Sequence, residues 1–323
     1  MKKICLSFIL LLFCSVFCFS AVPKWIVNLD KEFPSEKYIR AVGEGNSETS
    51  AKQAAVAELS SYFSETIESQ TYAHSYKSQN DSMYTSNSSI NQNITVSTDS
   101  ELFAVHYTQS WYDKKEKKYS VCAYINREEA FNIISQKLSL YEQSFIRKIK
   151  LEKTENEDFR KIIILNNALS EEQTMNTLYE YSMLLDFDKS KKFEDCMLLI
   201  EKEKNTLFKL KKENPVSVVS KGDFSEQIKS IISKIVTENG FTISKNANYK
   251  IISESTFKGL EANGIITCTP MITVFLEGKS GTISSCVPSL ENKSSYTKQT
   301  VIKMALAEIE NVLNEKLFQD LLK

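Results

Sequence analysis

The feature that most constrains the fold of this chain is a long stretch, residues 151–213, that contains neither glycine nor proline. These two residues end helices more often than others do, because glycine adopts the left-handed backbone and proline lacks an N–H group. The stretch is instead rich in Lys and Glu, with Leu, Ile and Phe between them. We therefore predict two or three helices here, arranged as a short helical hairpin that links the two ends of the chain.

Before this helical segment, residues 22–150 are typical of a domain that mixes strands and helices. Residues 38–42 predict a strand, and the turn Gly43-Glu44-Gly45 follows it. A helix comes next, with Asn46 or Ser47 as its N-cap, because small and apolar residues then recur at helical spacing. This expected stripe consists of Ala51, Ala54, Ala55, Leu59, Tyr62 and Phe63.

Two more strands are expected over residues 102–112 and 118–125. Asn126 is expected to cap the next helix, and Glu129 would complete a capping box. The buried stripe of this helix should contain Ala130, Ile134, Leu138, Tyr141, Phe145 and Ile149. The spacing of four and three residues between them is that of one helix face.

Aromatic side chains are concentrated on the first of these two strands. Phe103, Tyr107 and Trp111 alternate onto one strand face, so we expect them to pack as core against the alanine-rich helix. A stacking platform for a sugar or a peptide is the alternative.

Residues 214–323 predict a second domain of the same kind, which begins at the break made by Pro215. Asp223 and Glu226 are expected to cap a helix that ends at Asn239-Gly240, and a last helix should begin near Thr297. The expected strands are residues 216–219, 241–244 and 249–253 and a hairpin over 272–287. The predicted fold class is therefore α+β, with two small α/β sandwich-type domains joined by the helical segment.

Four cysteines follow residue 21: Cys122, Cys196, Cys268 and Cys286. A hairpin turn at residues 278–281 would pair Leu276 with Ile283, and this register places Cys268 on the core side and Cys286 on the opposite side. Plain buried thiols are therefore favoured over a bond between these two, and the pairing of the four cysteines stays open.

The amino terminus is typical of an exported bacterial protein. Lys2 and Lys3 precede an apolar stretch, residues 4–19, and the small residues Ser20 and Ala21 close it. We expect residues 1–21 to be a signal peptide, and a retained anchor is the weaker alternative. Cys14 and Cys18 follow phenylalanines, where a lipoprotein signal has a small residue, so lipidation is not favoured.

Four short motifs in residues 22–150 resemble the N-terminal domain of the Lpp-twenty family of twenty-kilodalton membrane-associated bacterial lipoproteins. The flagellar assembly protein T amino-terminal domain is similar in plan. The motifs are Pro23-Lys24-Trp25, the run Tyr38-Ile39-Arg40-Ala41-Val42-Gly43-Glu44-Gly45, Trp111-Tyr112-Asp113 and Arg127-Glu128-Glu129-Ala130. The resemblance implies an envelope location, often at the outer membrane, and a non-enzymatic role in surface assembly or partner binding. It supplies no catalytic residue.

Candidate catalytic and ligand-binding residues are few. Neither histidine, His74 or His106, has metal-ligand spacing, and the Gly43-Glu44-Gly45 turn lacks the third glycine of a dinucleotide fingerprint and the lysine of a P-loop. Asp186 and Asp188 are expected to be a solvated helix end. Lys and Arg number 40 against 41 Asp and Glu, which does not indicate nucleic-acid binding. We expect no catalytic site, cofactor, metal, nucleotide or nucleic-acid partner.

These observations predict a non-enzymatic protein of the periplasm or the outer-membrane periphery, which contacts other envelope proteins and associates with a membrane at most peripherally. A solute-binding module that uses a groove between the two domains is the alternative, and a hydrolase is a weaker one. The chain is polar from about residue 74 to 100, and residues 77–98 within this segment are a candidate contact loop, with Tyr84, Ile90 and Ile94 as possible partner contacts. A solvated hairpin extension is the other reading of this segment.

Overall fold

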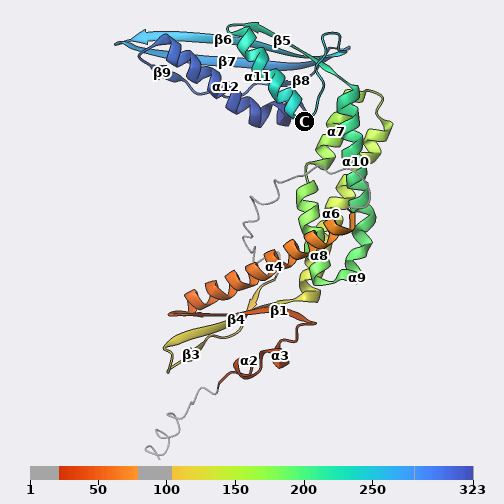
Figure 1. Ribbon diagram of the computed structural model, residues 1–323, viewed down its shortest axis with the longest axis vertical. Coiled ribbons are helices and arrows are strands. Elements are labelled where there is room, and N and C mark those ends of the chain that lie inside the picture. The colour runs from red at the N-terminus through yellow and green to blue at the C-terminus, as the bar shows by residue number, and fades with distance from the viewer. Residues whose placement is uncertain (1–21, 79–103, 280, 323) are drawn as a thin grey trace, which may run out of the picture. The chain divides into compact units, whose positions relative to one another are not determined.

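The computed structural model describes residues 22–78, 104–279 and 281–322 (Figure 1). The expected signal peptide and the candidate contact residues Tyr84, Ile90 and Ile94 therefore lie outside the described residues. The described chain combines helices with two sheets, so the predicted α+β class is confirmed. It divides into two compact units, which are Met1–Leu138 with Thr177–Lys191, and Ser139–Asn176 with Lys192–Lys323.

The first unit is built on a small antiparallel sheet whose central strand is β4 (Lys118–Asn126). β1 (Tyr38–Gly45) pairs with one edge of β4, and two short strands, β2 (His106–Tyr107) and β3 (Trp111–Asp113), pair with the other. The prediction of a single strand over residues 102–112 was therefore wrong, because two short strands occupy this part of the chain. Tyr107 lies opposite Ala123 and Trp111 opposite Ser120, so these two aromatic residues face opposite sides of the sheet.

α4 (Glu48–Ser78) packs on the face of this sheet to which Gly43 and Gly45 point. Ser47 is its N-cap, as predicted: the Ser50 N–H donates to Ser47 Oγ at 3.1 Å, and the Ser47 N–H donates to Ser50 Oγ at 3.0 Å. The glycines allow this contact because a Cβ atom at either position would collide with the α4 backbone. The turn that resembles a phosphate-binding motif is thus a site of close packing between strand and helix.

The predicted stripe of α4 is confirmed in its main members, with one exception. Ala51, Ala55, Leu59 and Phe63 are completely buried, whereas Tyr62 is 41% exposed. The polar segment expected from residue 74 begins later than predicted, because residues 74–78 belong to α4.

Helices form the part of the chain that follows β4 and precedes β5. The expectation that residues 151–213 are helical is confirmed, although they contain more helices than the two or three predicted. The elements of this part are α6 (Arg127–Thr154), α7 (Asp158–Leu169), α8 (Glu172–Leu185), α9 (Phe187–Ser190), a 3₁₀ turn (Lys191–Phe193) and α10 (Glu194–Glu213). Thr177–Lys191 belongs to the first compact unit and most of the other residues to the second. None of the described helices is long and apolar enough to span a membrane.

The amino terminus of α6 follows the prediction in part. Asn126 Oδ1 accepts the N–H groups of Glu128 and Glu129 at 3.0 and 3.2 Å. The Glu129 carboxylate, however, lies 3.0 Å from His106 Nε2. The predicted stripe is buried at Ala130, Ile134, Leu138, Phe145 and Ile149 and half-buried at Tyr141.

The second unit contains a sheet with the strand order β5-β6-β7-β8, and β9 also pairs with β7. Only β5 and β6 are parallel, and α11 connects them as a crossover. α11 and α12 cover the same face of this sheet (Figure 1). The elements are β5 (Val216–Gly222), α11 (Ser225–Glu238), β6 (Tyr249–Ala262), β7 (Ile265–Gly278), β8 (Gly281–Cys286), β9 (Lys293–Ser295) and α12 (Lys298–Leu321).

The core of the second unit extends beyond the residues that the sequence assigned to the C-terminal domain. Phe159 and Ile162 of α7 are completely buried in it. The Phe159 ring stacks on Phe241 at 5.6 Å between centroids, and Phe241 stacks on Phe318 at 5.2 Å. α7 therefore completes the core, and the boundary at residue 214 does not separate two independent cores.

The α11 cap and the strand at residues 241–244 differ from the prediction. Asp223 accepts the N–H of Phe257 on β6 at 2.9 Å, and the N-cap of α11 is Phe224, whose backbone is left-handed (φ 54°). Residues 241–244 form only an isolated bridge between Ile243 and Val216. α11 nevertheless ends at Asn239 before Gly240, as expected.

The register of the last hairpin was also wrong. A bulge between Leu276 and Glu277 shifts the pairing, so Val274 lies opposite Cys286. Cys286 is therefore completely buried on the core side, contrary to the prediction. The expectation of plain buried thiols is confirmed for all four described cysteines, which are buried and are not joined by disulfide bonds. Cys268 and Cys286 are about 20 Å apart along β7, because Cys286 is paired six residues beyond Cys268.

Candidate partner-binding groove

A groove of about 420 Å³ lies on the face of the first sheet opposite α4. α2 (Lys24–Val27) and α3 (Leu29–Glu32) form one side of it, and strands β1, β3 and β4 form the rest. Both tryptophans of the chain line it. The residues of this tryptophan groove are Trp25, Ile26, Leu29, Val42, Glu44, Trp111, Asp113, Glu116, Lys118 and Ser120.

Short-range hydrogen bonds hold the helical side of the groove. The Pro23 carbonyl accepts the Ile26 N–H at 3.0 Å, which starts α2 with Trp25 pointing into the unit at 7% exposure. Asn28 then caps α3 by accepting the Lys31 N–H at 2.9 Å. Asp30 of α3 forms an ion pair with Arg40 of β1, which ties this helix to the sheet.

The opposite side of the groove is the hairpin that joins β3 to β4. Asp113 Oδ1 accepts the N–H groups of Lys115 and Glu116 at 2.7 and 3.3 Å, which stabilises the turn. Trp111, half-buried, lies opposite Ser120 on β4 and contributes an aromatic surface. Glu116, which belongs to this turn, lines the same groove as Trp111.

The floor of the groove follows from strand alternation. Gly43 and Gly45 point to α4, so Val42 and Glu44 point to the other face. Val42 is 40% exposed, so the groove has an accessible apolar side chain. Lys118 Nζ lies 3.5 Å from the Glu44 carboxylate, and both groups are solvent-exposed.

The layer beneath this face contains one cation and one thiol. The Arg40 guanidinium is 13% exposed, and its Nε atom is buried without a hydrogen-bond partner. Burial raises the pKa of the Cys122 thiol to about 11, although the nearby Arg40 charge acts in the opposite direction. The thiol is therefore protonated and unreactive at neutral pH.

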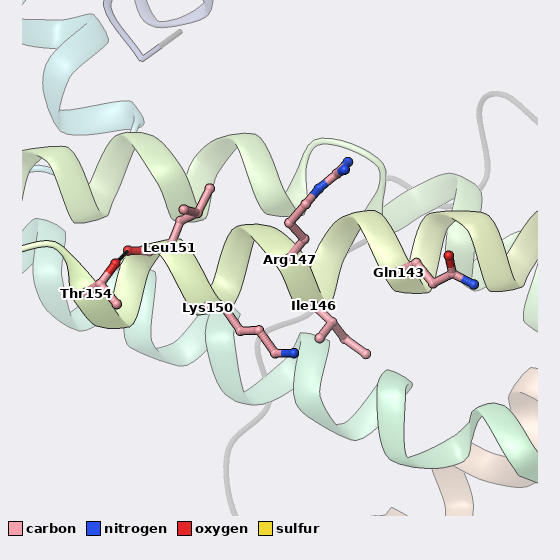
Figure 2. Close-up of a pocket in the computed structure, with 6 residues that line it drawn as sticks. All are labelled: Gln143, Ile146, Arg147, Lys150, Leu151 and Thr154. Carbon is pink, nitrogen blue, oxygen red and sulfur yellow. Dashed lines mark hydrogen bonds between the residues drawn. The ribbon is translucent and has the colours of Figure 1, made fainter.

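A second hollow, of about 530 Å³, lies on α6 and is lined by that helix alone. Figure 2 shows Arg147 and Leu151 pointing to one side of the helix and Lys150 and Ile146 to the other. These side chains do not converge on one point, whereas binding sites gather a few polar groups around an apolar surface. The tryptophan groove meets that description better.

The residues singled out from the sequence have structural roles where they are described. His106 lies against Tyr124, with 5.5 Å between ring centroids, and bonds to Glu129. Asp186 caps α9 by accepting the Lys189 N–H at 3.1 Å, so the helix-end prediction is confirmed. Among the residues described, no three His, Cys, Asp or Glu side chains gather as a metal site would require.

Tyr107 and Trp111 are not the core against α4 that we expected, and Phe103 lies outside the described residues. Tyr107 is 39% exposed beside α4, where Lys52 Nζ lies 5.8 Å from its ring centroid, and Tyr112 is 43% exposed. Trp111 faces the other side and lines the groove. Sequence analysis did not predict that Trp25 and Trp111 line the same groove.

Comparisons with known proteins are sparse. No protein-family model matches the chain, and no curated protein matches it. One similar solved structure is a secreted protein of the human pathogen Helicobacter pylori, with 13% identity, a TM-score of 0.39, and coverage of 86% of this chain and 98% of that chain. Another is a minor lipoprotein of Acinetobacter baumannii, with 18% identity, a TM-score of 0.24, and coverage of 33% of this chain and 86% of that chain. Both TM-scores are below 0.5, so neither likeness decides the fold or the function.

Proposed function

We propose that this chain is a non-enzymatic protein of the bacterial cell envelope, located in the periplasm or at the outer-membrane periphery. In this proposal it supports the assembly of envelope or surface structures by binding other envelope proteins. The tryptophan groove is its contact site.

The observation that carries the proposal is the convergence of both tryptophans in one accessible groove. Trp25 and Trp111 come from separate elements, and Val42, which lines the same groove, is 40% exposed. Tryptophan is enriched at the centres of protein interfaces because it buries a large apolar surface. The volume of the groove falls in the range of roughly 300–1,000 Å³ that is typical of ligand sites. The signal-type amino terminus and the motifs that resemble those of the Lpp-twenty family support the envelope location.

Site-specific photo-cross-linking in the bacterium that encodes the chain tests this function. A photoreactive phenylalanine at Val42 should give a discrete adduct with an envelope protein after irradiation. Val219 on β5 is the matched control, because it is also a valine and is 37% exposed. The function is refuted if position 42 gives no adduct, or if positions 42 and 219 give the same adducts.

A further inference from the structure

We propose, as an extension of the function proposed above, that the tryptophan groove binds a partner segment with an Arg or Lys side chain between apolar residues. The alkyl part of that side chain would lie against Trp111 and Val42. Its charged end would reach the carboxylates of Asp113 and Glu116.

The first support is the distribution of charge along the lining. Glu44, Asp113 and Glu116 are acidic, and Lys118 is the single base among the lining residues. Because Lys118 lies 3.5 Å from Glu44, these two charges offset each other and two carboxylates remain, at Asp113 and Glu116. A cation in the groove would meet opposite charge, whereas an anion would meet like charge.

The second support is the order of polar and apolar surface. Ile26, Leu29 and Val42 supply apolar side chains to the lining. Asp113 follows Trp111 by two residues on the same face of β3, and Glu116 belongs to the turn that Asp113 stabilises. Arg and Lys have the matching shape, an apolar stem with a charged end. A cation over a tryptophan face is also attracted by the ring quadrupole. Arg suits this arrangement best, because its planar guanidinium both stacks on an aromatic ring and binds a carboxylate.

Three other lysines belong to the same turn and oppose this preference. Lys114, Lys115 and Lys117 are exposed and do not line the groove. Their repulsion of a cationic segment passes through solvent and is weakened by salt. Neutralising Lys115 and Lys117 with glutamine should therefore strengthen the binding of a cationic segment modestly, and more at low salt than at physiological salt.

Tryptophan fluorescence gives a direct test, since the chain has no tryptophan outside the groove. The probes are two blocked peptides, Gly-Leu-Arg-Leu-Gly and Gly-Leu-Glu-Leu-Gly, titrated to millimolar concentration into the chain that starts at Val22. We expect a saturable change in emission with the Arg peptide and none with the Glu peptide. Asp113→Asn with Glu116→Gln should weaken binding about tenfold or more, because a charge-assisted hydrogen bond is lost. Asn keeps the oxygen that accepts the turn N–H groups, and Glu116→Gln alone serves if the double variant does not fold.

Glu254→Gln with Glu261→Gln on β6 is the control pair and should bind as the unmodified chain does. Equal binding of the two peptides, no saturable signal with the Arg peptide, or unchanged binding by the Asp113 and Glu116 variants would overturn this inference. The proposed function would still stand if the Val42 adduct forms. Peptide binding without that adduct would instead refute the function and leave the ligand preference in place.

Discussion

At the residue scale, Gly43 is the position where the first sheet and α4 come closest. A Cβ atom there would collide with the backbone of Ala51 and Ala55, which cannot move aside as a flexible side chain can. We predict that Gly43→Ala lowers the free energy of unfolding by about 1–3 kcal/mol, the usual cost of overpacking. Urea unfolding followed by circular dichroism measures this change.

The control for this substitution is Gly259→Ala on β6. Its new methyl group would have no neighbour nearer than the Thr267 carbonyl oxygen at 4.0 Å. We expect little change in stability there, or a small increase because alanine restricts the unfolded chain. Equal losses at the two glycines would show that the packing of α4 on β1 is not the cause.

The thiols give a second prediction at this scale. Burial raises the pKa of Cys122 and that of Cys196 to about 11, and Cys268 and Cys286 are also buried. At pH 8 the folded chain that starts at Val22 should therefore react slowly with a disulfide reagent, and it should release four equivalents after denaturation. Gln143→Cys, exposed on α6, is the positive control. Rapid reaction of a native thiol would contradict this account.

The same pKa shifts determine whether the stability of the folded chain rises or falls with pH. A thiol that ionises near pH 9 when unfolded and near pH 11 when folded favours the folded state fully below pH 9. That stability is lost as the pH rises from 9 to 11, because the unfolded chain ionises first. Replacement of Cys122 by alanine should make the stability profile flatter in this window.

At the scale of elements, α7 is expected to stabilise the second unit through one side chain. Phe159 is completely buried and lies against Phe241 and Tyr249, at 5.6 and 4.8 Å between ring centroids. Phe159→Ala should cost about 3–5 kcal/mol of unfolding free energy. Phe208→Ala on α10 is the matched control, because Phe208 is 52% exposed, and it should cost far less. Similar losses for both variants in thermal and urea unfolding would contradict a core role for α7.

Helices were predicted well from the sequence because their signals are local and repeated. The spacing of Val301, Ala305, Ile309 and Leu317 fixes one face of α12, and Thr297 caps this helix as expected. The register of the last hairpin depends instead on one bulge between Leu276 and Glu277, and no residue type at this position predicts a bulge. The role of Asp223 was missed for a related reason. Its carboxylate binds a strand N–H 34 residues away, an alternative that local capping patterns do not reveal.

At the scale of the whole molecule, the candidate site could not be predicted because it joins distant parts of the chain. Trp25 and Trp111 line one groove only because β3 pairs with β4 and α2 lies over the same sheet face. Strand alternation placed Val42 and Glu44 on one face, but it did not say which face α4 would cover. That choice depends on Gly43 and Gly45, whose lack of a side chain lets the helix approach.

The last prediction concerns which part of the chain folds independently. The break at Pro215 predicted that a fragment of residues 214–323 would fold alone. In the structure, the core of that region includes Phe159 and Ile162 from α7, and Leu207 and Leu210 of α10 pack against it. A fragment of residues 214–323 would expose this apolar surface, so we expect a broad unfolding transition and binding of a hydrophobic dye.

A fragment of residues 139–323 retains α7 and α10 and should unfold in one cooperative transition. Comparison of the two by urea titration decides the point. A sharp transition in the shorter fragment, with a stability equal to that of the longer one, would show that residues 214–323 form a complete core without α7 and α10.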